Sequence, residues 1–235
     1  MKQKKRSLTF LDHLDELRGR VITFLVVYIF SCVFAYNFTG RILPYIIKPV
    51  GSVVFNAPGE AFSAYMLFTL LEGFVIALPF FLYQVWSFAW EALTDKERKY
   101  ILIFGPLSLL FFIGGGFFAY FVIVPIAIKF LLGFSSVYVV PMISIKNYIS
   151  FIGSIILSFA IIFELPLILV FLVKIGIATP EFLRQYRRHA IMGILIVSAI
   201  LTPPDICSQL LMAVPLVVLY ELGVLFSVLA YRKRI

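Results

Sequence analysis

The chain has 235 residues, of which 62% are hydrophobic and only 14% are charged, with a formal net charge of +8. A water-soluble domain usually carries about a quarter charged residues, so this composition indicates a protein whose solvent is the lipid bilayer. The charged residues stand at the ends of long apolar runs, which is typical of membrane topology and argues against a nucleic-acid partner. Because these runs are continuous rather than alternating, they favour helices over a membrane barrel. The sequence therefore predicts an all-α, polytopic membrane protein with residues 1–235 in a single domain.

Six membrane-spanning helices are expected. Their approximate bounds are 18–38, 61–92, 97–134, 147–174, 188–201 and 206–231. The second and third exceed the roughly 20 residues of a perpendicular span, and Pro79, Pro106 and Pro125 predict kinks within them. The apolar part of the fifth, 190–201, is about 18 Å long and precedes a turn at 202–205. We therefore expect a concave, cupped arrangement whose fifth and sixth helices are short or thin the bilayer.

The positions of lysine and arginine predict which side each loop faces. Of the 20 such residues, 16 lie in the two termini and in the two loops that this scheme puts on one side. The others stand on the opposite side: Arg41, Lys48, Lys129 and Lys146. Because cytoplasmic loops are enriched in these residues, both termini are expected in the cytoplasm. The longest loop on the opposite side, 37–60, is apolar, and we expect it to cap the helices.

Three acidic residues fall inside apolar runs: Glu72, Glu164 and Glu221. A carboxylate near the middle of a bilayer is costly, so each should be protonated or should face the protein interior or a wet cavity. Pro166 follows Glu164 and frees backbone groups nearby, which predicts a polar pocket for a partner helix or a polar substrate segment. The alternative is a hydrogen-bonded glutamate that fixes helix packing, and we favour it for Glu72 and Glu221.

A second set of acidic residues lies on the basic, cytoplasmic side. These residues either precede the first span or separate the second from the third: Asp12, Asp15, Glu16, Glu91, Asp95 and Glu97. A partly shielded carboxylate there can hold the planar fork of an arginine through two hydrogen bonds. The alternative is pairing within the chain, with Glu16 bound to Arg20 at helical spacing. Glu97 would then pair with Arg98 or Arg188, and exposed pairs of this kind contribute less than about 1 kcal/mol.

No set of residues in the sequence indicates an enzyme. His13 and His189 stand alone, and Cys32 and Cys207 lie in or beside apolar runs, so neither a metal site nor a disulfide framework is expected. A phosphate-binding loop and a nucleophile with its base are also missing from the sequence. We therefore expect a protein without catalytic activity and without a cofactor or metal.

Seven short motifs, in this order along the chain, resemble those of the TatC family, the large integral component of the twin-arginine translocase. They are FLDHLDELRGR at 10–20, LPFFLYQVWSF at 78–88, KER at 96–98, the segments 117–125 and 159–166, LTPPD at 201–205 and YELG at 220–223. The resemblance covers residues 8–230. It implies a receptor in the bacterial cytoplasmic (inner) membrane that binds twin-arginine signal peptides of folded proteins. It also implies self-association and assembly with TatA- and TatB-type single-span proteins, driven by the proton-motive force.

The same resemblance assigns expected roles to particular residues. Glu16 and Glu97 would contact the arginine pair, and Leu17 and Arg18 would support that site. The remaining assignments are an intramembrane polar site and an external turn: Glu164, Pro203 and Asp205. Two residues depart from the family pattern. Glu91 stands where proline is usual, so the second helix is expected to run further, and Leu67 stands where many relatives carry a basic residue.

Two other functions remain open at this point. A secondary transporter or proton channel would use the three intramembrane glutamates, although no inverted repeat supports it. A scaffold or insertase without peptide specificity would use the same helices but would not distinguish arginine from lysine in a signal peptide.

Overall fold

The computed structural model describes residues 10–95, 97–135, 141–201 and 206–232, and almost all of them are helical. The helices are α1 (Phe10–Ile47), α2 (Glu60–Ala92), α3 (Arg98–Phe118), the π-helix η1 (Ala119–Ile123), α4 (Val124–Leu132), α5 (Ile145–Ile162), α6 (Glu164–Ile175), α7 (Pro180–Gln185), α8 (Arg187–Leu201) and α9 (Ile206–Arg232). The expected all-α class is confirmed. The expected turn at Pro203 and Asp205 lies outside the described residues.

Five segments within the described ranges are long and apolar enough to cross a membrane. They are Asp15–Ile47, Glu60–Glu91, Arg98–Leu132, Ile145–Ile175 and Met212–Tyr231. The helix in the place of the expected fifth span, α8, has 15 residues. It is therefore about 22 Å long, which is shorter than a hydrocarbon core of about 30 Å.

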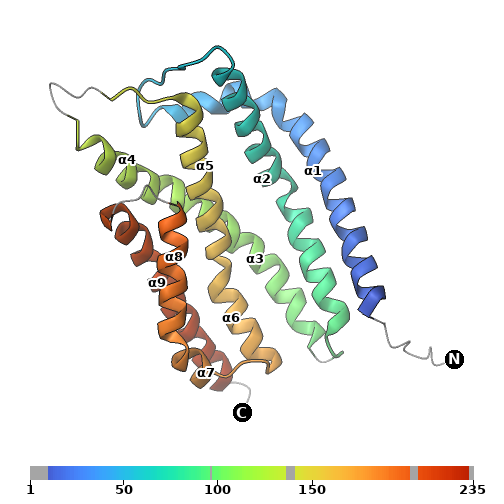
Figure 1. Cartoon of the computed structure of the whole chain (residues 1–235). Helices are drawn as coiled ribbons and strands as arrows, with labels where there is room; N and C mark the ends of the chain where they lie inside the picture. Colours follow the sequence, from blue (N-terminus) through green and yellow to red (C-terminus); the bar gives the residue numbers. More distant parts are fainter. Residues whose placement is uncertain (1–9, 96, 136–140, 202–205, 233–235) are drawn as a thin grey trace.

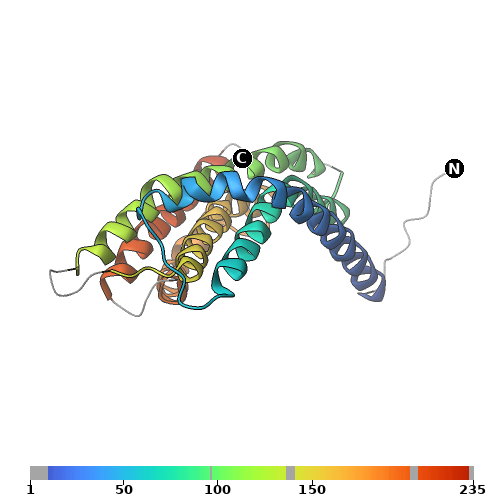
Figure 2. The ribbon, with the colours of Figure 1, turned by 90° about the horizontal axis from the view of Figure 1, so that it is seen from above.

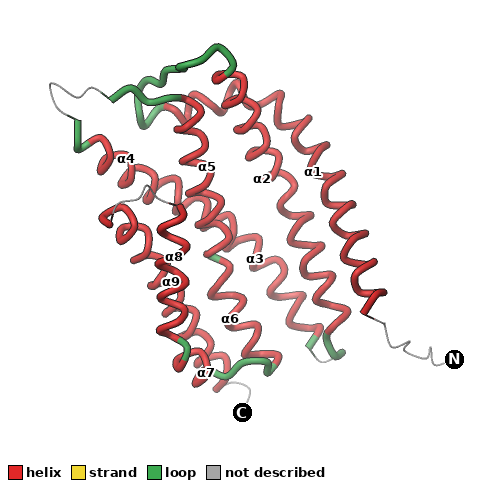
Figure 3. Tube along the Cα trace, in the orientation of Figure 1, coloured by secondary structure: helices red, strands yellow, loops and turns green. Residues whose placement is uncertain are grey.

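The helices lie side by side, mostly in chain order (Figure 1). Helix α1 forms one edge and packs along α2, while α8 and α9 form the opposite edge, with α3, α5 and α6 between them (Figures 1 and 3). Seen from above, α1 again lies at one end of the row (Figure 2). The largest buried cluster joins α2, α5, α6 and α9, and its fully buried members include Phe159, Ile155 and Leu216.

Helix α1 is longer at both ends than the expected span at 18–38. Its early residues include leucine, glutamate and arginine, which are strong helix formers, so the polar segment before the apolar run continues the same helix. The helix also runs past Pro44, and the expected long loop shrinks to residues 48–59. Two tyrosines secure this end, since Tyr148 donates to the Ile46 carbonyl at 2.8 Å and Tyr120 to the Tyr45 carbonyl at 3.1 Å.

The loop that remains is fastened to the start of α5. The Val54 N–H donates to the Ile143 carbonyl, and the Ile145 N–H donates to the Val54 carbonyl, each at 2.9 Å. The Ser144 hydroxyl also donates to the Glu60 carboxylate at the start of α2. These contacts connect the α1–α2 loop to α5 across more than 80 residues of sequence.

Backbone irregularities occur where glycine or proline interrupts the long apolar runs. The third run changes from α3 to the π-helix η1 just after Gly114, Gly115 and Gly116, and Pro125 follows in the first turn of α4. The fourth run breaks at Phe163, three residues before Pro166, because proline cannot donate the next helical hydrogen bond. Of the three prolines expected to cause kinks, Pro125 lies at the change of helix type in the third run, whereas Pro79 and Pro106 lie inside the continuous helices α2 and α3.

Several glycines allow helices to approach closely, among them Gly73 and Gly223. A Cβ atom at Gly73 of α2 would lie 2.8 Å from the Cα of Cys32 in α1, and closer still to its Sγ. A Cβ atom at Gly223 of α9 would lie 2.9 Å from the Cα of Pro166 in α6. Small residues at these positions let the backbones touch, which is a main source of packing energy between membrane helices.

Candidate functional site

One end of the bundle gathers most of the charged side chains. There α1 begins, α2 meets α3, and α7 connects α6 to α8 (Figure 1). The basic residues at this end include Arg18, Arg20, Arg98, Lys99, Lys174, Arg184, Arg187 and Arg188. We call it the basic end. Glu16 and Glu97 both belong to it, because Glu16 lies near the start of α1 and Glu97 directly precedes α3.

A guanidinium group lies at the centre of the acidic cluster on α1 and α2. Arg20 donates from Nε to the Glu16 carboxylate at 2.7 Å, and its Nη2 atom reaches Glu16 at 2.5 Å and Glu91 at 3.0 Å. A third nitrogen donates to the Gln84 side-chain carbonyl at 3.2 Å. The pairing of Glu16 with Arg20, which the sequence left as an alternative, is therefore present.

This cluster is partly shielded from water. The side chain of Arg20 is 17% exposed and that of Glu16 is 22% exposed, while Glu91 is more open at 41%. The Phe88 ring lies 6.0 Å from the guanidinium carbon and covers one side of it. Charge-assisted hydrogen bonds are stronger in such surroundings than in open water. The geometry thus shows a place where carboxylates and an aromatic ring hold one arginine side chain.

Glu97 shapes the connection between α2 and α3. Its carboxylate accepts hydrogen bonds from the Thr94 backbone N–H at 3.0 Å and the Thr94 hydroxyl at 2.6 Å. Its neighbour Arg98 pairs with Asp95 at 3.2 Å and lies over the Trp90 ring at 5.4 Å. These contacts order a short loop beside the Arg20 cluster and keep the Glu97 carboxylate at the basic end.

Leu17 and Arg18 lie beside Glu16 but have exposed side chains, with 44% of Leu17 accessible. They are therefore available for contact with another molecule or with lipid. The sequence pattern named Glu91 among the acids of this side but did not pair it with Arg20, and it did not indicate Gln84. A signal was present, since these residues are seven positions apart and so lie two turns apart on one face of α2.

The intramembrane acids have different surroundings. Glu221 pairs with Arg187 at 2.7 Å at the basic end. Glu164, the first residue of α6, is only 9% exposed, and its Oε1 atom has no hydrogen-bond partner in the described part of the chain. Glu72 accepts a hydrogen bond from the Thr39 hydroxyl at 2.5 Å. Glu164 and Glu72 thus each have one buried carboxyl oxygen without a hydrogen-bond partner among the described residues.

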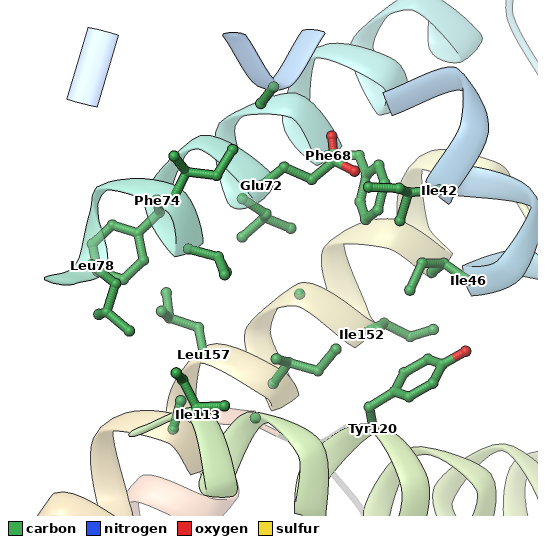
Figure 4. A pocket seen from close by; sticks show the side chains of 18 of the residues that line it. Ile42, Ile46, Phe68, Glu72, Phe74, Leu78, Ile113, Tyr120, Ile152 and Leu157 are labelled. Carbon is green, nitrogen blue, oxygen red and sulfur yellow. The ribbon is translucent and has the colours of Figure 1, made fainter. Parts of the chain in front are cut away.

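An apolar groove of about 550 Å³ lies between α1, α2, α3, η1 and α5 (Figure 4). Glu72 is the acidic residue of its wall, and the other labelled side chains are apolar apart from the Tyr120 hydroxyl. Ala160, which is one turn before Glu164, lines the same groove. The groove therefore extends from Glu72 to within one helical turn of Glu164.

Comparisons with known proteins agree over nearly the whole chain. Residues 12–215 match the family model described as TatC, Sec-independent protein translocase protein. The Sec-independent protein translocase protein TatC of Carboxydothermus hydrogenoformans is 36% identical, over 94% of this chain and 93% of its own. That of Aquifex aeolicus is 35% identical, over 95% of this chain and 96% of its own. A crystal structure of the twin-arginine translocase receptor TatC is also similar, with a TM-score of 0.85 at 34% identity, covering 93% of this chain and 99% of that one.

Proposed function

This chain belongs to the TatC family of Sec-independent protein translocase components, and on that basis we propose that it is a receptor for twin-arginine signal peptides of folded proteins. The observation that carries the proposal is the Arg20 guanidinium held by Glu16, Glu91 and Gln84. A cluster that already binds one arginine in a partly shielded place offers the chemistry that an arginine pair from another chain requires. The proposed role is recognition, without catalysis, cofactor or metal.

We also propose the membrane arrangement in which this recognition occurs. Residues 1–235 would form one six-helix transmembrane domain, concave and cupped, with α8 as the short fifth span in the bacterial inner membrane. The bias of 16 of 20 lysines and arginines towards one side supports placing both termini in the cytoplasm. The basic end then faces the cytoplasm, where signal peptides arrive.

Binding would proceed from the charged end into the bilayer. Glu16 and Glu97 receive the arginine pair, and the exposed Leu17 and Arg18 support the peptide backbone beside them. The apolar stretch of the signal peptide then lies along the helices towards Glu164. TatA- and TatB-type helices assemble nearby, and the proton-motive force drives export. In this scheme Pro203 and Asp205 form the turn on the far side of the membrane.

Replacing Glu97 with alanine is expected to weaken binding of a twin-arginine signal peptide by about tenfold, because one charge-assisted hydrogen-bond acceptor is lost. Glu97→Gln should weaken it by a similar or somewhat smaller factor. The measurement is the dissociation constant of a fluorescent signal peptide with the protein in lipid nanodiscs. Asp95→Asn is the matched control, because it removes an 85%-exposed carboxylate from the same loop and should leave the affinity unchanged. Unaltered affinity in both Glu97 variants would refute the assigned role.

The two rival functions predict different results in the same preparation. A transporter or proton channel would produce solute or proton flux in liposomes that contain this protein alone, although the pairing of Glu221 with Arg187 makes that acid a poor carrier. A scaffold without specificity would crosslink equally to Arg-Arg and Lys-Lys signal peptides. We expect no flux and a clear preference for the arginine pair.

A further inference from the structure

A short chain of hydrogen bonds joins α1 to α2 through two buried threonine side chains. The Thr39 and Thr69 hydroxyls are 2.9 Å apart, and Thr39 also donates to the Oε2 atom of Glu72 at 2.5 Å. Both threonines are buried, with Thr39 fully inaccessible. These bonds fix the Glu72 side chain and direct its carboxyl group in one orientation.

The other oxygen of this carboxyl group has no hydrogen-bond partner. The Oε1 atom of Glu72 is buried and is unpaired among the residues that the structure describes. Glu72 also belongs to the wall of the apolar groove, together with Ile42, Phe68, Ile113 and Ile152 (Figure 4). An unpaired polar atom in such surroundings is costly, so a donor brought in by an occupant of the groove would be favoured.

The position of Glu72 relative to the arginine cluster suggests what that occupant is. Glu72 and Glu91 are 19 residues apart on α2, which corresponds to about 28 Å along the helix axis. Between the groove and Gln84, exposed side chains follow one another on a single face of α2 at Ile76, Pro79 and Tyr83. A helical segment whose arginines are held near Glu91 could lie along this face and reach Glu72.

We propose that the groove binds the apolar segment of the signal peptide as a helix, and that Glu72 accepts a hydrogen bond from a donor side chain about 19 residues beyond the arginine pair. This inference rests on the proposed function. In hydrocarbon the inserted segment pairs its own backbone groups by being helical, so only a side chain can supply the donor. A lipid acyl chain would match the apolar wall but offers no donor to Glu72.

Glu72 would thus recognise a hydrogen-bond donor of the peptide that lies beyond the reach of the arginine site. Glu16 and Glu97 receive the arginine pair at the charged beginning of the segment, whereas Glu72 contacts a polar side chain near its other end. The distance between the arginine site and Glu72 is fixed. Binding therefore also depends on the number of residues between the arginine pair and the donor, because a donor placed too early or too late does not meet the Glu72 carboxyl group.

The test is a donor scan with synthetic peptides and the full-length protein in nanodiscs. Each peptide carries an arginine pair followed by a helix of leucine, alanine and valine, in which one valine is replaced by the isosteric threonine. The replaced position moves from about 8 to about 24 residues beyond the arginines. We expect threonine at about position 19 to bind about three- to fifteenfold more tightly than valine, and positions several residues away to show no preference.

The variants separate this inference from the proposed function. Glu72→Leu should abolish the threonine preference, and Glu72→Gln should retain part of it because the amide oxygen still accepts. Ser154→Ala is the control, since that hydroxyl bonds the Phe151 carbonyl of its own helix and should not alter the preference. The ratio of threonine to valine affinity within each variant does not depend on how much protein is folded.

Two results would overturn the inference. One is a flat donor scan in the parent protein while the arginine pair is still required for binding. The other is a threonine preference that persists in Glu72→Leu. If instead Lys-Lys peptides bind as well as Arg-Arg peptides, then the proposed function itself is refuted, and not only this inference.

Discussion

Replacing Glu16 with lysine is expected to lower the affinity for a twin-arginine signal peptide by at least about 100-fold. The substitution removes a carboxylate that contacts Arg20 at 2.5 and 2.7 Å and puts a second cation beside it. Two like charges about 4 Å apart repel by about 4 kcal/mol at an effective dielectric constant of 20, so an arriving arginine meets repulsion where it had attraction. The dissociation constant of a fluorescent peptide in nanodiscs measures the loss.

The control for Glu16→Lys is Glu181→Lys, which changes the net charge equally at an exposed position of α7 at the same end. It should weaken binding less than about threefold. A charge exchange, Glu16→Arg with Arg20→Glu, adds a second comparison. It can restore an ion pair between α1 positions 16 and 20 and so preserve folding, yet it moves the carboxylate by one turn. If the exchanged protein binds peptide normally, then Glu16 itself is not the contact.

Replacing Gly73 with alanine is expected to destabilise the protein by about 3 kcal/mol. The new Cβ atom would lie 2.8 Å from the Cα of Cys32, and because that atom belongs to the backbone, α1 and α2 must move apart. Their separation would also disturb the hydrogen bond from Thr39 to Glu72. The measurement is the free energy of unfolding in detergent micelles.

Gly114→Ala provides the matched control, because it makes the same change inside a helix with nothing within 4 Å of the new atom. Alanine favours helix over glycine by up to about 1 kcal/mol, so this variant should be neutral or slightly stabilised. If both variants behaved alike, the close contact between α1 and α2 would not be a significant source of stability.

Much of the architecture could be predicted because hydrocarbon imposes simple rules. Long apolar runs must be helical, and helices occupy the ranges expected for the second, third, fourth and last spans. The end of α1 was less predictable. Pro44 and the following residues suggested a loop, but tertiary contacts from Tyr120 and Tyr148 hold the helix to Ile47. The π-helix η1 likewise depends on packing that no local pattern specifies.

The sequence predicted individual residues of the candidate site but not how their side chains come together. The sequence identified Glu16 and noted Glu91 as unusual for the family. It did not indicate that both would meet on Arg20 with Gln84, because that depends on how α1 lies against α2. Glu72 was interpreted as a packing residue, which describes its bond to Thr39 but not its unpaired oxygen in the groove.

The position of α1 at the edge of the bundle has a consequence for the biogenesis of this protein. Its extensive helix contacts within the described ranges are with α2, which follows it directly in the chain. The α1–α2 hairpin, with its close approach at Gly73, can therefore assemble as soon as the first 92 residues have entered the membrane. By contrast, α6 must wait for α9, whose Gly223 contacts Pro166, so the Arg20 cluster of α1 and α2 can form before synthesis of the chain is complete.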